Sequence, residues 1–330
     1  MFYRCKNCGG NVLFDPVKKK MVCDSCHSED SGQLISQEKL HICNNCGAQL
    51  ELKDNVLAER CPYCKTSIIL EDRMEEEYRP DLVVPFAIDR HTAAQKLLDN
   101  FKNKLFLPGN FCSAASLEHM EGMYVPFWMY DLCAHVDFEG EGKKIRVWTE
   151  GDYECTETKY YRVSREFQAN YDKLPVDASP ERDDGLMDLL EPYEYEELIG
   201  FEPEYLSGFS ADVWEESKEQ LRPRAEQKAN RFSEEYLREM TSEYDSVSAD
   251  HGGHKIIENT ERGTSYAFLP VWRYVYGYGG KNYEFYVNGQ TGKTIGAPPI
   301  SKGKAFGMSA ALFASLFFCL RMICFFLEVL

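Results

Sequence analysis

The sequence predicts two small β units in tandem at the N-terminus, then an α+β domain with aromatic-rich antiparallel strands, and an apolar helix at the C-terminus. Three observations support this order. Four Cys-x-x-Cys pairs fill the first 65 residues, two distant aromatic segments alternate with period two, and a stretch near the end carries no charge. The expected units are residues 1–38, 39–72, 81–300 and 305–330, with an acidic linker at residues 73–80.

The cysteines repeat with one spacing, and this is the most specific motif in the chain. Residues 5–9 (CKNCG) align with residues 43–47 (CNNCG), which brings residues 23–26 onto residues 61–64 without a gap. Four thiolates complete the tetrahedral shell of a structural Zn²⁺ and leave no open position. We therefore expect two tandem zinc ribbons that bind two structural zinc ions. The predicted ligands are Cys5, Cys8, Cys23, Cys26, Cys43, Cys46, Cys61 and Cys64.

The sequence around the cysteines fits this interpretation. Gly9 and Gly47 follow the first pair of each repeat, where a tight turn often needs a positive φ angle. Residues 12–14 and 49–52 are expected to leave these turns as strands. Segments this short bury too little apolar surface to fold alone, so zinc binding, worth on the order of 10 to 16 kcal/mol, would supply their stability.

Two other uses of the cysteines stay open: disulfides of a secreted domain and ligation of an iron–sulfur cluster. Residues 1–10 do not resemble a signal peptide, and the regular spacing matches zinc better than a cluster. His27 and His41 lie beside ligand cysteines and could replace one of them. Because each repeat already has four cysteines, we expect both histidines to be bystanders.

The chain is acidic, and its charge is unevenly distributed. The formal net charge is −17, of which residues 1–70 contribute +1 and residues 71–330 contribute −18. Nucleic-acid binding relies on a basic surface, so this balance argues against a nucleic-acid partner. The one basic run of the ribbons, residues 18–20, is expected to be a solvated turn rather than a phosphate contact.

The remaining cysteines lack ligand spacing, and we expect them to be ordinary thiols. They are Cys112, Cys133, Cys155, Cys319 and Cys324. Unpaired thiols beside a metal-bound set are typical of a reducing compartment, so the folded part should face the cytosol.

A candidate membrane helix lies near the end of the chain. Residues 305–320 carry no charge, and the sequence continues apolar after Arg321. About 20 helical residues span the hydrocarbon core, so we expect a transmembrane helix within residues 305–330. A buried core helix or a re-entrant segment is the alternative, because the uncharged stretch is short. Lys302 and Lys304 precede it, so the positive-inside rule predicts a single-pass cell-membrane protein with its N-terminal bulk in the cytoplasm.

The α+β domain is expected to begin near Asp81, after an acidic run at residues 75–77. Asp89 can cap a helix over residues 91–104, in which apolar residues recur at helical spacing. The dipeptide at residues 108–109 (PG) would end this helix.

Two aromatic segments that share a Pro-x-Trp pattern, residues 123–130 and 267–276, predict two related strands of one domain. Residues 283–287 alternate in the same way. They predict a hairpin closed by Asn288-Gly289 and continued through residues 291–294.

The region between the aromatic strands carries mostly helical signals. Residues 183–200 have apolar residues at helical spacing, interrupted by Pro192. Ser210 can cap a longer helix over residues 211–240, which Pro223 would kink or break. The charges of this helix are expected to form a solvated face, with a partner-binding face as the alternative. The order strand, helices, strand predicts an α+β domain rather than an alternating α/β sheet.

The sequence contains no familiar catalytic motif: no P-loop, no Gly-x-Ser-x-Gly and no His-Glu-x-x-His. Residues 251–254 (HGGH) follow Asp250 and could hold a metal, but without a third strong ligand nearby we expect a flexible loop. Residues 288–293 (NGQTGK) could suggest a phosphate loop, but the flanking strands favour a turn. We predict no catalytic or cofactor-binding residue and no small-molecule substrate.

Several short motifs, in this order, resemble those of a bacterial family of membrane proteins with two zinc ribbons of the transcription-factor-IIB type. The motifs are the paired ribbons and residues 84–86, 124–128, 205–209, 269–272 and 287–293. Members of that family carry transferred labels such as primosomal helicase, but this chain lacks nucleotide-binding motifs, so we expect no helicase activity. The resemblance implies an association with envelope-stress systems and membrane-organising scaffold proteins. It also implies a longer or cleaner membrane end than this one, which contains Arg321 and Glu328.

These observations favour a non-enzymatic, membrane-anchored adaptor that faces the cytosol and recruits membrane or membrane-scaffold proteins. The alternative from another class is a nucleic-acid-binding accessory protein of replication or transcription, which predicts salt-sensitive binding by residues 1–70. A third hypothesis is an enzyme whose site is assembled from Asp, Glu, Tyr and His side chains of the α+β domain.

Overall fold

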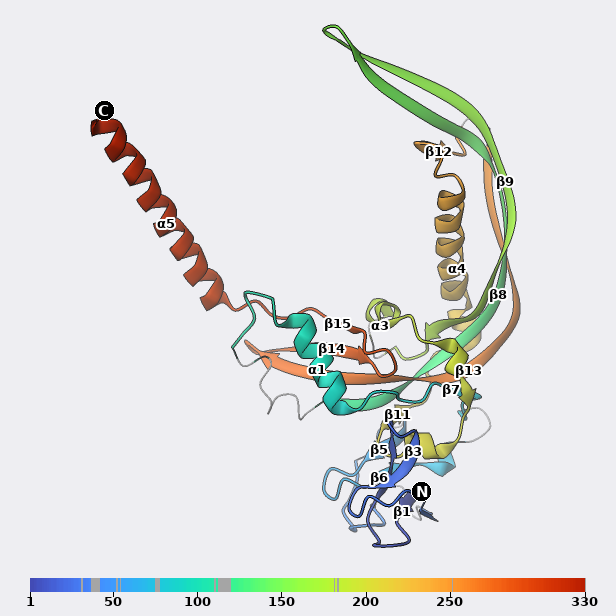
Figure 1. Cartoon of the computed structure of the whole chain (residues 1–330). Helices are drawn as coiled ribbons and strands as arrows, with labels where there is room; N and C mark the ends of the chain where they lie inside the picture. Colours follow the sequence, from blue (N-terminus) through green and yellow to red (C-terminus); the bar gives the residue numbers. More distant parts are fainter. Residues whose placement is uncertain are drawn as a thin grey trace.

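Over the residues that it describes, the computed structural model of the chain has two small two-stranded sheets and one sheet of eleven strands. In Figure 1 the N-terminal strands lie at one end, the large sheet rises from them as an arch, and a long helix projects from the other flank. The structure describes residues 1–30, 32–36, 42–51, 53, 55–74, 78–109, 111, 120–180, 182, 184–250 and 252–329.

The two cysteine repeats form six short strands. The first repeat contributes β1 (Phe2–Arg4), β2 (Val12–Asp15), β3 (Lys20–Cys23) and β4 (Gln33–Ile35), and the second contributes β5 (Val56–Arg60) and β6 (Ser67–Ile69), followed by the 3-10 turn η1 (Glu71–Arg73). The strand expected at residues 12–14 is therefore confirmed. In the second repeat, Gln49 makes only an isolated bridge with Ile42, and Leu52 lies outside the described residues.

Three long antiparallel strands form the arch. They are β8 (Glu121–Glu150), β9 (Tyr153–Asp177) and β13 (His254–Tyr278), with β8 in the middle. The two aromatic segments are adjacent, as expected for strands of one domain: Phe127 of β8 lies opposite Ala267 of β13. Figure 1 shows the helix α4 (Lys218–Met240) on the concave side of the arch.

The prediction of a mostly helical region between the aromatic strands is correct only in part, because helix α4 lies there but the first part of the region is strand. Residues 131–177 extend β8 and form β9 instead. One face of β8 is buried at every second residue, at Leu132, Ala134, Val136 and Phe138, which is the period of a strand. Cys133, His135 and Asp137 lie between these positions, so the period-two pattern is present in the sequence.

The large sheet also includes the second cysteine repeat. Strand β5 pairs with β11 (Ser210–Asp212), and β11 pairs in parallel with β8. The sheet therefore runs across residue 72, where the sequence suggested a boundary between units. Shorter strands complete it: β7 (Leu82–Val83), β10 (Ile199–Gly200), β12 (Ser246–Ser248), β14 (Lys281–Asn288) and β15 (Thr294–Gly296).

The predicted C-terminal hairpin is present. Strands β13 and β14 turn at Gly279 and Gly280, which have φ angles of 61° and 75°. The next turn, from β14 to β15, starts at Asn288, whose side-chain oxygen accepts the backbone N–H groups of Gln290 and Thr291 at 2.9 Å. Those N–H groups are thus used inside the turn, as expected for a connection rather than a phosphate loop.

The helices differ from expectation in their boundaries. Helix α1 (Arg90–Phe101) is capped by Asp89, as predicted, with its carboxylate accepting the Thr92 N–H at 2.8 Å. The helix expected over residues 183–200 is shorter. It is α3 (Asp184–Leu190), followed by η2 (Tyr195–Glu197), β10 and η3 (Pro203–Leu206).

The long helix does not start at Ser210. Ser210 belongs to strand β11, because pairing with β8 and β5 outweighs the local helical signal. Helix α4 starts at Lys218, where Ser217 and Gln220 form a capping box. Pro223 lies inside α4 and does not end it.

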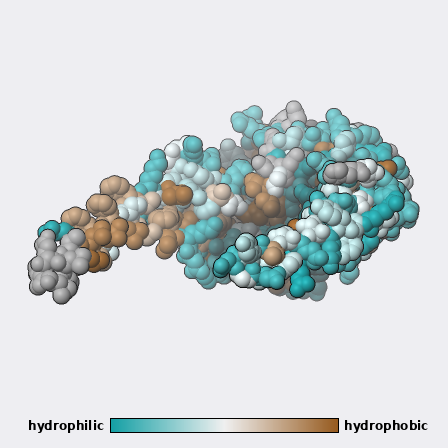
Figure 2. Space-filling view, turned by 90° about the horizontal axis from the view of Figure 1, so that it is seen from above, coloured by the Kyte–Doolittle hydropathy of each residue, from teal (hydrophilic) through white to brown (hydrophobic). Residues whose placement is uncertain are grey.

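The C-terminal helix α5 (Lys302–Val329) projects from the body. Its segment Lys302–Ile323 is, by length and composition, able to cross a membrane, and none of it is buried. Figure 2 shows it as a mostly hydrophobic arm beside a mostly hydrophilic body. The helix begins slightly before residue 305, where it was predicted to start.

The adjacent residues Ser207 and Gly208 connect both cysteine repeats to the main domain. The Ser207 hydroxyl donates to the Val12 carbonyl at 2.7 Å, and the Ser207 carbonyl accepts the Phe14 N–H at 2.9 Å. The neighbouring Gly208 N–H donates to the Ser67 hydroxyl at 2.9 Å. Ser207 is buried, so these bonds are shielded from water.

We expect the substitution Ser207→Ala to lower the free energy of unfolding by about 1 to 3 kcal/mol, because the buried Val12 carbonyl loses its donor. Urea unfolding of the zinc-loaded protein measures the change. Ser246→Ala, at an exposed position of β12, is the matched control and should change stability little. Equal stability of the two variants would show that this docking contact is dispensable.

Candidate metal centres

The structure brings the eight predicted cysteines together as two tetrads. The first contains Cys5, Cys8, Cys23 and Cys26, and the second contains Cys43, Cys46, Cys61 and Cys64. Within each tetrad the sulfur atoms lie within 4.8 Å of one another. The four cysteines of each tetrad could therefore bind a single metal ion, each through its sulfur atom.

The sulfur spacing fits tetrahedral coordination. The Sγ atoms of Cys5 and Cys26 are 3.7 Å apart and those of Cys8 and Cys23 are 3.5 Å apart. In the second tetrad the corresponding distances are 3.7 Å and 3.8 Å. Zinc–sulfur bonds of roughly 2.3 Å at tetrahedral angles place sulfur atoms about 3.8 Å apart, so each tetrad could hold a zinc ion.

All four Cys-x-x-Cys turns have the same backbone. The carbonyl of the first cysteine accepts the N–H of the residue four positions later, and its N–H donates to the carbonyl five positions later. The residue directly after the second cysteine has a positive φ angle in all four turns: 76° at Gly9, 58° at His27, 73° at Gly47 and 61° at Lys65. The sequence indicated this geometry only at the two glycines.

An amide and a hydroxyl accompany each tetrad, and the sequence analysis missed both. The Nδ2 atoms of Asn7 and Asn45 lie 3.7 Å from the sulfurs of Cys26 and Cys64. The hydroxyls of Ser28 and Thr66 lie 3.2 Å from the same two sulfurs. Extending the repeat alignment would have revealed them, because Asn7 aligns with Asn45 and Ser28 with Thr66. Such outer hydrogen bonds orient metal ligands and tune their basicity.

The same groups favour the thiolate form of one cysteine in each tetrad. The hydroxyl and backbone N–H of Ser28 lower the pKa of Cys26 to about 5. At Cys64, partial burial opposes ionisation, but hydrogen bonds with the side chain and backbone of Thr66 outweigh it and lower the pKa to about 6. Burial raises the pKa of Cys43 to about 12. Metal binding must therefore displace protons from the less acidic thiols.

Hydrogen bonds connect the second tetrad to the first cysteine repeat. Thr66, beside Cys64, donates to the Asn11 side chain of the first repeat at 2.9 Å. Asn45 donates to Thr66 at 2.7 Å, and its oxygen accepts a bond from Arg4 at 2.8 Å. The second metal site is thereby linked to the backbone turn that follows the first.

Of the two histidines near the tetrads, the structure describes His27, which does not join a tetrad. His27 belongs to neither group, and its backbone N–H donates to the Cys23 carbonyl at 3.1 Å. His41 lies outside the described residues.

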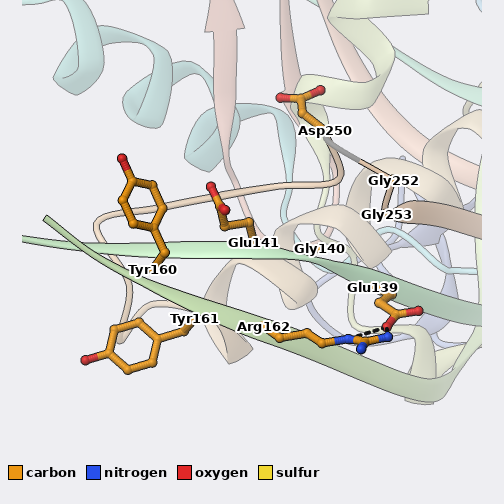
Figure 3. A pocket seen from close by; sticks show the side chains of 9 residues that line it. All are labelled: Glu139, Gly140, Glu141, Tyr160, Tyr161, Arg162, Asp250, Gly252 and Gly253. Carbon is orange, nitrogen blue, oxygen red and sulfur yellow. Dashed lines mark hydrogen bonds and ion pairs between the residues drawn. The ribbon is translucent and has the colours of Figure 1, made fainter.

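The other metal candidate lies on the arch, beside a hollow of about 330 Å³ that Figure 3 shows. The hollow is lined by Asp250, Gly252 and Gly253, and by the bonded pair Arg162 and Glu139. His251 lies outside the described residues, and His254 contacts Asp137 at 3.0 Å. Among the residues that the structure describes, only the two cysteine tetrads form a group suited to a metal ion.

We expect Asn45→Ala to weaken metal binding at the second tetrad by roughly 10- to 100-fold, because the Cys64 sulfur and Thr66 lose their amide partner. Competition of the purified protein with a chelator of known zinc affinity measures this. Asn44→Ala is the matched control, because the Asn44 side chain bonds to the Ser36 carbonyl outside the tetrad. Unchanged affinity in Asn45→Ala would contradict the role assigned to the amide.

Comparison with known proteins places the chain in a family. No family model matches it, and no solved structure matches it. The uncharacterized protein YdjG of Bacillus subtilis (strain 168) is 35% identical to it over 332 residues, which cover 97% of this chain and 96% of that protein. The similarity thus spans the cysteine repeats, the arched sheet and the C-terminal helix together. The chain belongs to the same protein family as YdjG.

Proposed function

We propose that this protein is a non-enzymatic, membrane-anchored adaptor whose zinc ribbons and arched domain face the cytosol and hold protein partners at the bilayer. We also propose that it is a member of the transcription-factor-IIB-type double-ribbon membrane family. Its partners would be membrane proteins or membrane-organising scaffold proteins.

The observation that carries the proposal is the exposure of α5. Large apolar side chains stand out from it on all sides, among them Phe306 (77% exposed), Phe313 (72%) and Phe318 (68%). Leaving such a surface in water is unfavourable by roughly 25 cal/mol per Å² of apolar area, whereas a bilayer accommodates it. Lys302 and Lys304 at its start favour a cytosolic body.

The metal sites support a structural rather than a catalytic role. Four thiolates per tetrad leave no coordination position for water or substrate. The hydrogen bonds of Asn45 and Thr66 are directed to the tetrad and to the first repeat, which suits a rigid brace. We infer that zinc fixes a surface that partners recognise.

Removal of residues 302–330 is expected to release the protein from membranes into the soluble fraction, because the apolar arm is lost. Fractionation of cells with and without a high-salt wash measures this. Replacing Phe313 with Ala is the control and should leave the protein in membranes, since one side chain contributes a small part of the buried area. Membrane retention of the truncated protein would contradict anchoring by α5.

The adaptor role is tested by co-purification from detergent-solubilised membranes. We expect membrane or scaffold proteins to accompany the wild type and to be lost in Cys43→Ser/Cys61→Ser. The double variant Cys133→Ser/Cys155→Ser, outside the tetrads, should retain them. Recovery of nucleic acid that dissociates at high salt would instead favour an accessory protein of replication or transcription, and multiple-turnover activity would favour an enzyme.

A further inference from the structure

The outer edge of β9 is open. Among the described strands, β9 pairs only with β8, although it is 25 residues long. Strand β12 covers the other edge of the hairpin no further than Lys143 of β8. Beyond that point the β8–β9 hairpin extends past the body, as Figure 1 shows. An open edge presents backbone N–H and C=O groups that are ready to pair with another strand.

The distal part of this hairpin also exposes apolar side chains. Tyr153 is 77% exposed, Tyr160 61%, Val147 54% and Ile145 48%. Tyr153 and Tyr160 belong to β9, and Val147 and Ile145 lie on β8 opposite Thr156 and Thr158 of β9. Exposed apolar groups gathered on one element are typical of an interaction surface.

The sequence of the edge is self-complementary about one residue. In an antiparallel pair of two β9 strands with the two-fold axis at Thr158, Glu154 lies opposite Arg162, and Glu157 lies opposite Lys159. Every charged residue from Glu154 to Arg162 then faces an opposite charge. Moving the axis by one residue places Glu157 or Lys159 opposite itself, which is destabilising.

The side chains needed for this pairing are accessible. Lys159 and Glu157 are 59% and 43% exposed and lie 3.5 Å apart within one strand. Arg162 is 82% exposed while it contacts Glu139. Association would exchange these weak surface pairs for pairs across the axis and would add a ladder of backbone hydrogen bonds.

We propose that a second copy of this chain docks on the β9 edge, antiparallel to the first, with the two-fold axis at Thr158. The arches of two copies then form one continuous sheet. Such an interface is isologous and closes as a dimer, with residues 153–163 of each β9 strand in the pair. Thr158 lies closer to the hairpin turn than the β9 residues that are level with β12 on the far side of β8. The bodies of the two copies therefore stay apart.

Charge reversal tests the register. We expect the full-length protein in detergent to have the mass of a dimer in sedimentation or light-scattering experiments. Glu157→Lys places two like-charge pairs in the interface and should convert the dimer to the monomer at the same concentration. Glu157→Lys/Lys159→Glu should restore the dimer. Glu235→Lys, an exposed position on α4 with the same charge change, is the matched control and should remain dimeric.

Cysteine crosslinking tests the axis directly. In a Cys155→Ser background, Thr158→Cys lies opposite its own copy and should form an intermolecular disulfide on mild oxidation. Thr156→Cys, which would face Tyr160, should not. A wild-type monomer at all concentrations, a dimer insensitive to Glu157→Lys, or crosslinking at position 156 but not 158 would each overturn the proposal.

Discussion

The second cysteine tetrad is the constraint on which one side of the large sheet depends. Strand β5 ends at Arg60, directly before Cys61, and β6 begins at Ser67, three residues after Cys64. The Cys61/Cys64 turn is therefore the connection between two strands of the sheet. The apolar cluster around it is small, with Leu50, Ile68 and Leu70 beside the cysteines. Metal binding is the main source of free energy that could hold this hairpin.

The first repeat then depends on the second. Met1 pairs with β6 through the Ile69 N–H, which donates to the Met1 carbonyl at 2.8 Å. Asn11 accepts the Thr66 hydroxyl, and Ser207 joins β2 to the turn that carries Gly208. In these contacts the main domain supports the second cysteine repeat, and both support the first repeat. The two repeats of the sequence therefore have different structural roles: the second is part of the large sheet, and the first packs against it.

The candidate site was more predictable than the fold because metal ligation leaves a local signature in the sequence. Cysteine spacing encodes the turn, and Gly9 and Gly47 mark its left-handed residue, so the tetrads could be expected without tertiary information. Strand β9 could not be predicted in this way, because its partner is β8 and its exposed face is charged. Pairing across the sheet, and not local propensity, determines that this segment is a strand. Ser210 was misassigned for the same reason. Asp89, whose cap is local, was assigned correctly.

The length of the arch determines the distance between a partner bound at the hairpin turn and a partner bound at the cysteine tetrads. The 30 residues of β8 correspond to roughly 100 Å of strand contour, measured from the end beside the cysteine repeats to the hairpin turn. A molecule held at the turn and a molecule held at the tetrads would therefore be out of reach of each other's side chains. Electrostatic influence between them would be negligible, since the Debye length is about 8 Å at physiological salt. The arch therefore holds the two binding positions apart, and any coupling between them must pass through the sheet itself.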